Sequence, residues 1–165
     1  MRISLQSALL AALFGVALIY FATPSRAEDS CRTWSAEVED DEGGPVLTAS
    51  ACSNDSSEAR LSLKCFSGKV WLEYDLGVGG DREPEYDETA TVEFVTDAGA
   101  EAVPMTFQAM NAMFGGETPA EGPLTKLLME NASVLVRDQA GAYPARTYSL
   151  KGSRAAIKAL VDQCG

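Results

Sequence analysis

Glu73 and Asp75 are the residues of this chain whose type and spacing come nearest to a catalytic pair. They alternate with Leu72 and Tyr74 in a segment that reads as a β-strand, so both carboxylates project from one face. Two carboxylates across a cleft can hydrolyse a glycosidic bond. Nothing in the sequence indicates the raised pKa that the acid partner needs. The same spacing describes the outer face of an ordinary strand, and we predict that the chain is not an enzyme.

The absence of histidine excludes most other catalytic chemistry. A Ser-His-Asp triad, a Cys-His dyad, a His-ligated zinc site and an ordinary haem site all need an imidazole. The glycine-rich segment 77–80 is not followed by the Lys-Ser or Lys-Thr of a phosphate loop. We therefore expect neither a cofactor nor a metal ion.

The acidic loop over residues 81–88 could gather carboxylates around calcium, which takes about six to eight oxygen ligands. The loop lacks the spacing of a calcium-binding loop, and runs of charge are normally solvated. It directly follows the strand that carries Trp71, and a tryptophan among carboxylates suits the anchoring of a basic protein. The predicted partner-binding residues are Trp71, Glu73, Asp75, Asp81, Glu83 and Glu85.

Trp71 has a second interpretation. Val70, Leu72, Tyr74 and Leu76 form the apolar side of the strand, and Trp71 lies on the opposite side. If both faces of the strand are covered, Trp71 is a core residue, as large aromatic side chains mostly are. A groove on the Trp71 face would favour the partner-binding interpretation over the core interpretation.

The charge of the chain is strongly negative, with 13 Lys+Arg against 24 Asp+Glu and a net charge of -11. This balance argues against nucleic acid as a partner, because neutralisation of phosphates by Lys and Arg dominates such binding. Most of the acids lie before residue 102. Such a field favours solubility and attracts basic partners.

Residues 1–27 have the layout of a secretory signal peptide. Arg2 is followed by an apolar run from Ala8 to Ala22 and by small residues before Glu28. An uncleaved anchor is the alternative, but the run is shorter than the about 20 residues that span a bilayer. We predict cleavage after Ala27, a periplasmic or secreted protein without a stable membrane span, and a single domain over 28–165.

The four cysteines, Cys31, Cys52, Cys65 and Cys164, all follow the predicted cleavage site. An even number in an exported chain indicates disulfides, and four cysteines allow three connectivities. We favour Cys31–Cys52, which would join two neighbouring strands, and Cys65–Cys164, which would tie the last helix to the sheet. No free thiol is expected.

The apolar pattern predicts an α+β fold that is mainly antiparallel β-sheet and is stapled by disulfides. Alternation predicts that residues 60–66 and 69–76 form a hairpin. Pro123 opens a short helix over 123–130, and an apolar stripe with Ser153 as the cap predicts a helix over 153–164. Residues 111–122 are predicted to be irregular. Further strands are expected at 31–39, 46–51, 91–96, 103–110, 133–138 and 146–150.

The carboxyl-terminal two-thirds of the chain resembles a known group. The pattern Leu61-Ser62-Leu63-Lys64-Cys65, and later the segment from Thr147 to Cys164, is similar to the TagO/VasI-like periplasmic accessory proteins of type VI secretion. The spacing from Gly152 to Ala156 is also similar to the invasion-associated locus B family of exported proteins. The resemblance implies a fold and a compartment, and no catalytic residue.

Two functions follow as expectations. The first is a non-enzymatic periplasmic module that binds an envelope or secreted protein, or supports a secretion assembly. The second is an inhibitor of a basic secreted hydrolase such as lysozyme, because a small acidic exported domain suits that role electrostatically. Carbohydrate hydrolysis by paired carboxylates comes third.

Overall fold

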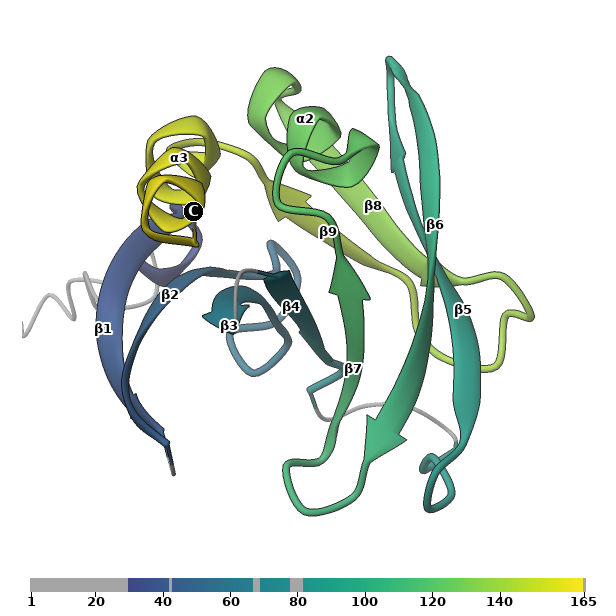
Figure 1. Cartoon of the computed structure of the whole chain (residues 1–165). Coiled ribbons are helices and arrows are strands. Elements are labelled where there is room, and N and C mark those ends of the chain that lie inside the picture. Colours follow the sequence, from purple (N-terminus) through teal and green to yellow (C-terminus); the bar gives the residue numbers. More distant parts are fainter. Residues whose placement is uncertain (1–29, 42, 67–68, 78–81, 165) are drawn as a thin grey trace, which may run out of the picture.

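The computed structural model describes residues 30–41, 43–66, 69–77 and 82–164. These ranges form a mostly antiparallel sheet with two helices, as the sequence predicts (Figure 1). The helices are α2 (Pro123–Glu130) and α3 (Ser153–Cys164), at the predicted positions. The strands are β1 (Ser35–Asp41), β2 (Gly44–Cys52), β3 (Arg60–Phe66), β4 (Lys69–Asp75), β5 (Thr89–Thr96), β6 (Gly99–Gln108), β7 (Met113–Thr118), β8 (Ser133–Asp138) and β9 (Arg146–Ser149).

All nine described strands belong to one sheet, in the order β1-β2-β3-β4-β7-β6-β5-β8-β9. Every neighbouring pair is antiparallel. The predicted hairpin is β3 and β4, in which Leu63 pairs with Leu72. The sheet curls until β9 meets the end of β2, where the Asn54 amide donates to the Thr147 carbonyl at 2.7 Å.

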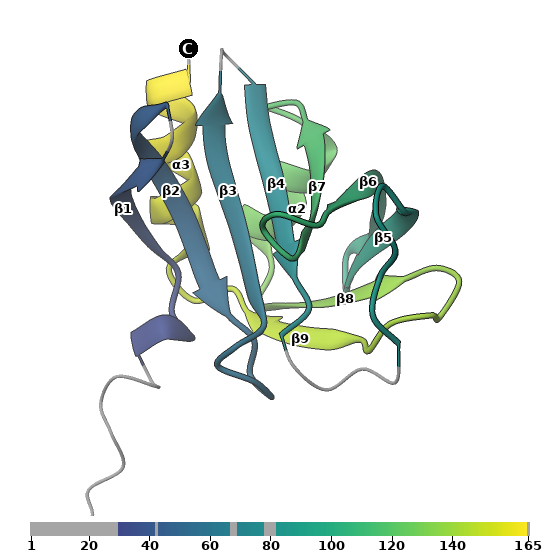
Figure 2. The same cartoon turned by 90° about the horizontal axis from the view of Figure 1, so that it is seen from below.

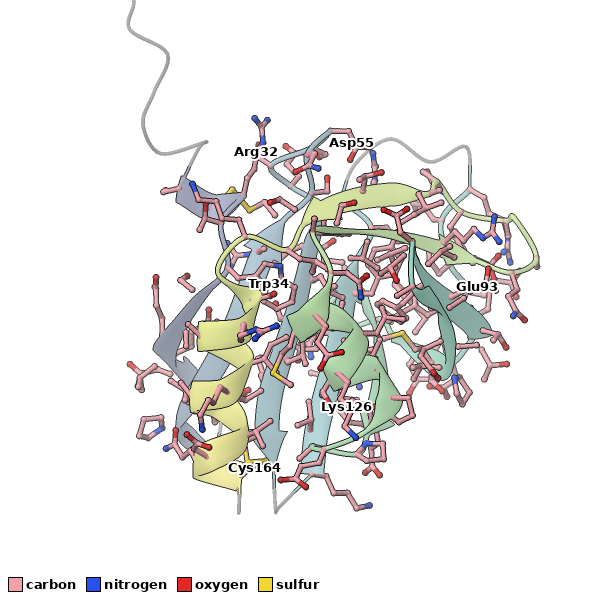
Figure 3. The ribbon with its side chains drawn as sticks, turned by 90° about the horizontal axis from the view of Figure 1, so that it is seen from above. Arg32, Trp34, Asp55, Glu93, Lys126 and Cys164 are labelled. Atoms are coloured by element: carbon pink, nitrogen blue, oxygen red, sulfur yellow. A yellow bond between two sulfur atoms is a disulfide. The ribbon has the colours of Figure 1, made fainter. Side chains whose placement is uncertain are left out.

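The hydrophobic core lies on the inner face of the curled sheet, under the two helices, and takes buried residues from every strand from β2 to β9 (Figures 1 and 3). Alternation along β3 and β4 directs Leu61, Leu63, Val70 and Leu72 to this face, and all four are fully buried. The predicted stripe of α3 is buried except for Val161, which is half-buried; its buried members are Ala156, Ile157, Leu160 and Cys164.

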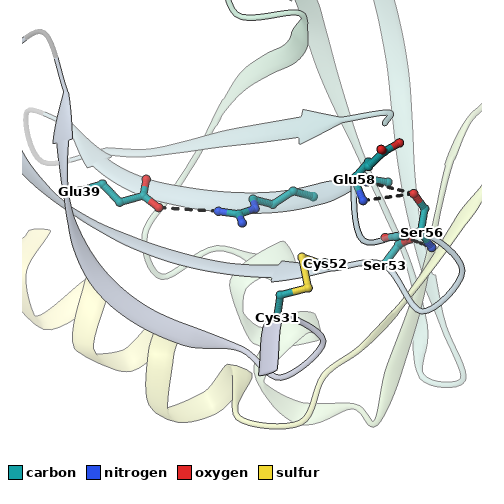
Figure 4. Close-up of a disulfide and its surroundings, with 8 residues drawn as sticks. Cys31, Glu39, Cys52, Ser53, Ser56 and Glu58 are labelled. Atoms are coloured by element: carbon teal, nitrogen blue, oxygen red, sulfur yellow. Dashed lines mark hydrogen bonds and ion pairs between the residues drawn. A yellow bond between two sulfur atoms is a disulfide. The ribbon is translucent and has the colours of Figure 1, made fainter. Parts of the chain in front are cut away.

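Both predicted disulfides are present. Cys31 joins Cys52 beside the start of β1 (Figure 4), and Cys65 joins Cys164, with Cα–Cα distances of 5.2 and 5.4 Å. No cysteine is free. Disulfides persist in oxidising environments, so the bridges indicate a compartment such as the periplasm or the cell exterior.

Ser153 has a different role from the predicted cap. Its hydroxyl lies 2.7 Å from the Leu128 carbonyl oxygen of α2 and 2.8 Å from that of Leu150. Because the hydroxyl is buried and donates to the carboxyl end of α2, it ties the two helices together instead of capping α3.

The prediction of irregular structure over 111–122 was wrong, because Met113–Thr118 is strand β7 between β4 and β6. Gly115 and Gly116 hid the strand, since glycine is depleted in strands. Both glycines serve close packing here. A Cβ on Gly115 would lie 2.5 Å from the Trp71 ring, and one on Gly116 would lie 2.8 Å from the Pro104 carbonyl oxygen.

The predicted apolar side of the first strand is only partly buried. Trp34 is buried and Ala36 is half-buried, whereas Val38 is 66% exposed. The reason is the place of β1, which is the last of the described strands in the sheet and pairs with only one of them, β2.

Candidate functional site

The outer face of the sheet is the face of β1–β4 and β7 that points away from α2 and α3 (Figure 2). Register places Thr48, Lys64, Trp71 and Glu117 in one row across β2, β3, β4 and β7. Since side chains alternate along each strand, all four project from this face. Tertiary pairing therefore collects on one surface residues that lie far apart in the sequence.

The Trp71 hollow is a recess of about 370 Å³ in this face. The end of β1 and the turn between β6 and β7 contribute to its lining, together with residues of β2, β3, β4 and β7. A second recess of about 270 Å³ shares Asp41, Lys64 and Glu73 with it. The lining residues of the Trp71 hollow are Asp41, Val46, Lys64, Trp71, Glu73, Gln108, Asn111 and Glu117.

Trp71 lies between the two interpretations of the sequence. It is half-buried and is not part of the hydrophobic core. Its ring lies over Gly115 of the neighbouring strand, where any larger residue would occupy the same space. The indole is thereby held in place by the sheet while it remains partly open to the hollow, which suits a binding surface.

Lys64 lies between two carboxylates at the base of the hollow. Its Nζ is 3.1 Å from Glu73 Oε2 and 3.4 Å from Asp41 Oδ2. Burial opposes the charged form of Lys64, but the attraction of Glu73 and Asp41 is stronger and raises the pKa of Lys64. The lysine therefore stays charged, and it neutralises part of the acidic lining.

Glu73 is only 8% exposed, in contrast to the exposed strand face that its spacing suggests. Burial raises the pKa of Glu73, and the nearby Asp41 and Glu39 add to the rise, while Lys64 opposes it. Two further ion pairs lie on the outer face. Arg60 Nη1 is 3.8 Å from Glu39 Oε1 (Figure 4 shows Glu39), and Lys69 Nζ is 2.7 Å from Glu117 Oε2.

The Glu73→Gln variant is expected to avoid the cost in stability of ionising a buried carboxyl group. Because the pKa of Glu73 is higher in the folded protein than in the unfolded chain, the free energy of unfolding falls as the pH rises through that range. As the pH rises above about 4, the ordinary pKa of glutamate, the variant should therefore gain stability relative to the wild type. Denaturant unfolding at several pH values measures this.

Glu117→Gln is the matched control for the Glu73 measurement, since it removes an exposed carboxylate of the same face. Its stability relative to the wild type should change less over the same range. If the wild type instead became more stable relative to Glu73→Gln as the pH rises, the raised pKa of Glu73 would be contradicted.

Two loops extend the hollow on one side. Tyr86 is 77% exposed and Met110 is 92% exposed, and both line a recess of about 440 Å³. This recess shares the lining residues Asp41, Gln108 and Asn111 with the Trp71 hollow. Asp87 and Ala112 in these loops have φ of +57° and +54°. Such left-handed residues are uncommon outside glycine, and Ala112 in particular carries backbone strain.

Arg82, Glu88 and Tyr143 hold the first of these loops. Arg82 donates through Nη1 and Nη2 to the two carboxylate oxygens of Glu88, at 2.8 and 2.7 Å, and the Tyr143 hydroxyl donates to Glu88 at 2.6 Å. The hydrogen bonds from Arg82, the Glu85 amide and Tyr143 lower the pKa of Glu88 to about 2. Near neutral pH the loop is thus tied to the β8–β9 connection.

The structure brings together only part of the predicted site. Trp71 and Glu73 line the hollow, whereas Asp75 accepts a hydrogen bond from the Gly77 amide at 2.9 Å and is not a lining residue. Glu83 and Glu85 are exposed and do not line the described recesses, and Asp81 lies outside the described residues.

Sequence reasoning missed most of the other lining residues. Lys64 could have been found, because the predicted hairpin register places it opposite Trp71. Asn111 and Glu117 lie in the segment predicted to be irregular, and Gln108 lies in a predicted strand whose partners the sequence does not indicate. Asp41 and Val46 come to the hollow because β1 pairs with β2 and β2 pairs with β3, which carries Lys64.

Within the described ranges, no three Cys, Asp or Glu side chains gather in a way that could hold a metal ion. No helix in the same ranges is long and apolar enough to cross a membrane.

Comparison of the chain with protein-family models, with curated proteins and with solved structures found no match. The resemblance to the TagO/VasI-like group stays a prediction.

Proposed function

We propose that this chain is an exported, non-enzymatic binding module whose Trp71 hollow holds a basic segment of an envelope or secreted protein. The observation that carries the proposal is the half-buried Trp71, fixed over Gly115 and surrounded by the carboxylates of Asp41, Glu73 and Glu117. An aromatic anchor in a partly desolvated recess is typical of the residues that dominate protein–protein affinity.

The charge of the chain supports a basic partner. After removal of residues 1–27 the chain would hold 11 basic and 24 acidic side chains, a net charge of -13. A field of this sign accelerates encounter with a positive surface and disfavours anionic partners. The signal-peptide pattern, the disulfides and the resemblance to secretion accessory proteins support a place in the cell envelope.

The inhibitor of a basic secreted hydrolase is the second candidate. It is favoured by the exposure of Tyr86 and Met110, because two large side chains on neighbouring loops could enter a cleft of an enzyme. An assay with lysozyme as the probe separates the two candidates, since only an inhibitor reduces the turnover of that enzyme.

Trp71→Ala is expected to weaken capture of a basic envelope protein at least about tenfold, as loss of an anchoring tryptophan does. The free energy of unfolding should fall by about 1–2 kcal/mol, because the ring is only half-buried. Capture is measured by quantitative pull-down of one identified partner, and added salt should weaken it by screening.

Leu135→Ala is the matched control, because Leu135 is half-buried on β8 and is not among the lining residues of the hollow. It should reduce stability by a similar amount and leave capture unchanged. Capture by Trp71→Ala at the wild-type level would refute the proposal. A fall in stability above about 3 kcal/mol would return Trp71 to the core interpretation.

A further inference from the structure

The two ends of the sheet differ. At β9, the Thr147 carbonyl accepts from the Asn54 amide at 2.7 Å and the Ser149 carbonyl accepts from Trp34 Nε1 at 3.0 Å, so this edge is covered. At the other end β1 pairs with β2, and no other described strand pairs with it. Figure 2 shows β1 as the outermost strand. Within the part of the chain that the structure describes, the sheet therefore keeps one open edge.

An open edge offers backbone donors and acceptors to a further strand, and proteins usually protect such edges with short strands, prolines or charges. β1 has seven residues, Ser35–Asp41, and none of them is proline. Val38 leaves 66% of its surface exposed at the middle of the strand. Length and exposed apolar surface thus make β1 able to accept a partner strand.

The side chains of β1 define what such a strand would carry. Glu37 and Glu39 point to the outer face, whereas Ala36 and Val38 point to the opposite face. Glu39 has a loose ion pair with Arg60 at 3.8 Å, and no described ion pair includes Glu37. In a pairing strand, a residue beside Glu37 or Glu39 meets a carboxylate, and a residue beside Val38 meets an apolar side chain.

The same charges oppose pairing of β1 with a second copy of the chain. Two β1 strands side by side would bring several carboxylates close together, and like charges across strands are destabilising. A strand with positive charges would instead be attracted by the same carboxylates that repel a second copy of β1.

We propose that the open edge of β1 accepts an extended segment of a basic protein as an additional strand of the sheet. Lys or Arg at every second position faces Glu37 and Glu39, and apolar side chains between them lie beside Ala36 and Val38. The proposal shares one assumption with the proposed function, namely that the partner is a basic protein. The edge of β1 and the Trp71 hollow are tested by different variants, so one can fail without the other.

The probe is the peptide acetyl-Thr-Lys-Val-Lys-Ile-Lys-Val-Thr-amide, with binding followed by isothermal titration at low salt. We expect it to bind at least about tenfold more tightly than a peptide of the same composition whose three lysines are consecutive. Equal binding of the two peptides would show charge attraction without strand pairing. Absence of binding would show that the acids of β1 only protect the edge. Either result overturns the proposal.

Methylation of backbone nitrogens tests the strand directly. One peptide is methylated at its three lysines, and the other at its three apolar residues. Because alternate amides of a strand point to opposite edges, one peptide loses donors to β1 and should bind at least about tenfold more weakly, while the other keeps its affinity within about twofold. Equal effects of the two methylations would overturn the proposal.

Variants of the chain complete the test. Glu37→Lys should weaken binding of the unmethylated peptide at least about tenfold, whereas Glu101→Lys, with the same change of net charge on β6, should not. Trp71→Ala should bind the peptide as the wild type does, so a failed hollow and a failed edge are distinguished. A Glu37→Lys chain that keeps wild-type affinity would overturn the proposal.

Discussion

Replacing Cys65 and Cys164 together by serine is expected to lower the free energy of unfolding by about 4–5 kcal/mol, against about 3 kcal/mol for Cys31 and Cys52. The two bridges close loops with sequence separations of 99 and 21 residues. A longer loop removes more conformational freedom from the unfolded chain, so the longer bridge contributes more. The Cys65–Cys164 bridge also fixes the last turn of α3 to β3.

The measurement is guanidinium unfolding of the wild type and the two double-serine variants, and each variant is the control of the other. The wild type should show no titratable thiol before reduction. A larger loss for the Cys31–Cys52 variant would contradict the entropic account, and a loss under about 1 kcal/mol for the Cys65–Cys164 variant would contradict the bridge itself.

Trp34→Ala is expected to lower the free energy of unfolding by about 3–5 kcal/mol. Trp34 is 4% exposed, and its Nε1 donates to the Ser149 carbonyl at 3.0 Å. Its backbone amide also donates to the Lys151 carbonyl at 2.9 Å, next to the first turn of α3 (Figure 3). Truncation therefore leaves a cavity and removes a partner of the covered edge of β9.

Trp34→Phe separates the two contributions, because it keeps an aromatic ring and removes the indole donor. We expect the free energy of unfolding of Trp34→Phe to lie between that of the wild type and that of Trp34→Ala. The comparison with Trp71→Ala is the sharpest control, since both variants truncate a tryptophan to alanine. Losses of equal size at Trp34 and Trp71 would contradict the assignment of one to the core and the other to the outer face.

Local patterns were sufficient for the elements whose partners are close in the chain. The hairpin of β3 and β4, the helix that begins at Pro123 and the buried stripe of α3 follow from alternation, proline chemistry and helical spacing. These signals lie within a few residues of the structure they determine.

β7 and the exposure of Val38 could not be read locally. Gly115 belongs to a strand because it pairs with Glu73 of β4 and Thr106 of β6, and it must be small because the Trp71 ring, 44 positions earlier in the sequence, lies over it. Val38 is exposed because β1 became the end of the sheet. Both facts depend on the order of strands, which local alternation does not contain.

The sequence by itself determined the antiparallel α+β class and the face of β4 that carries Trp71 and Glu73. It left three cysteine pairings open, and the favoured one is present. Only the tertiary structure decided that Glu73 is buried beside Lys64, that Asp41 and Glu117 join it, and that Glu83 and Glu85 do not line the hollow. The physical reason is that side-chain direction repeats every two residues along a strand, whereas the contents of a sheet surface depend on pairing between distant segments.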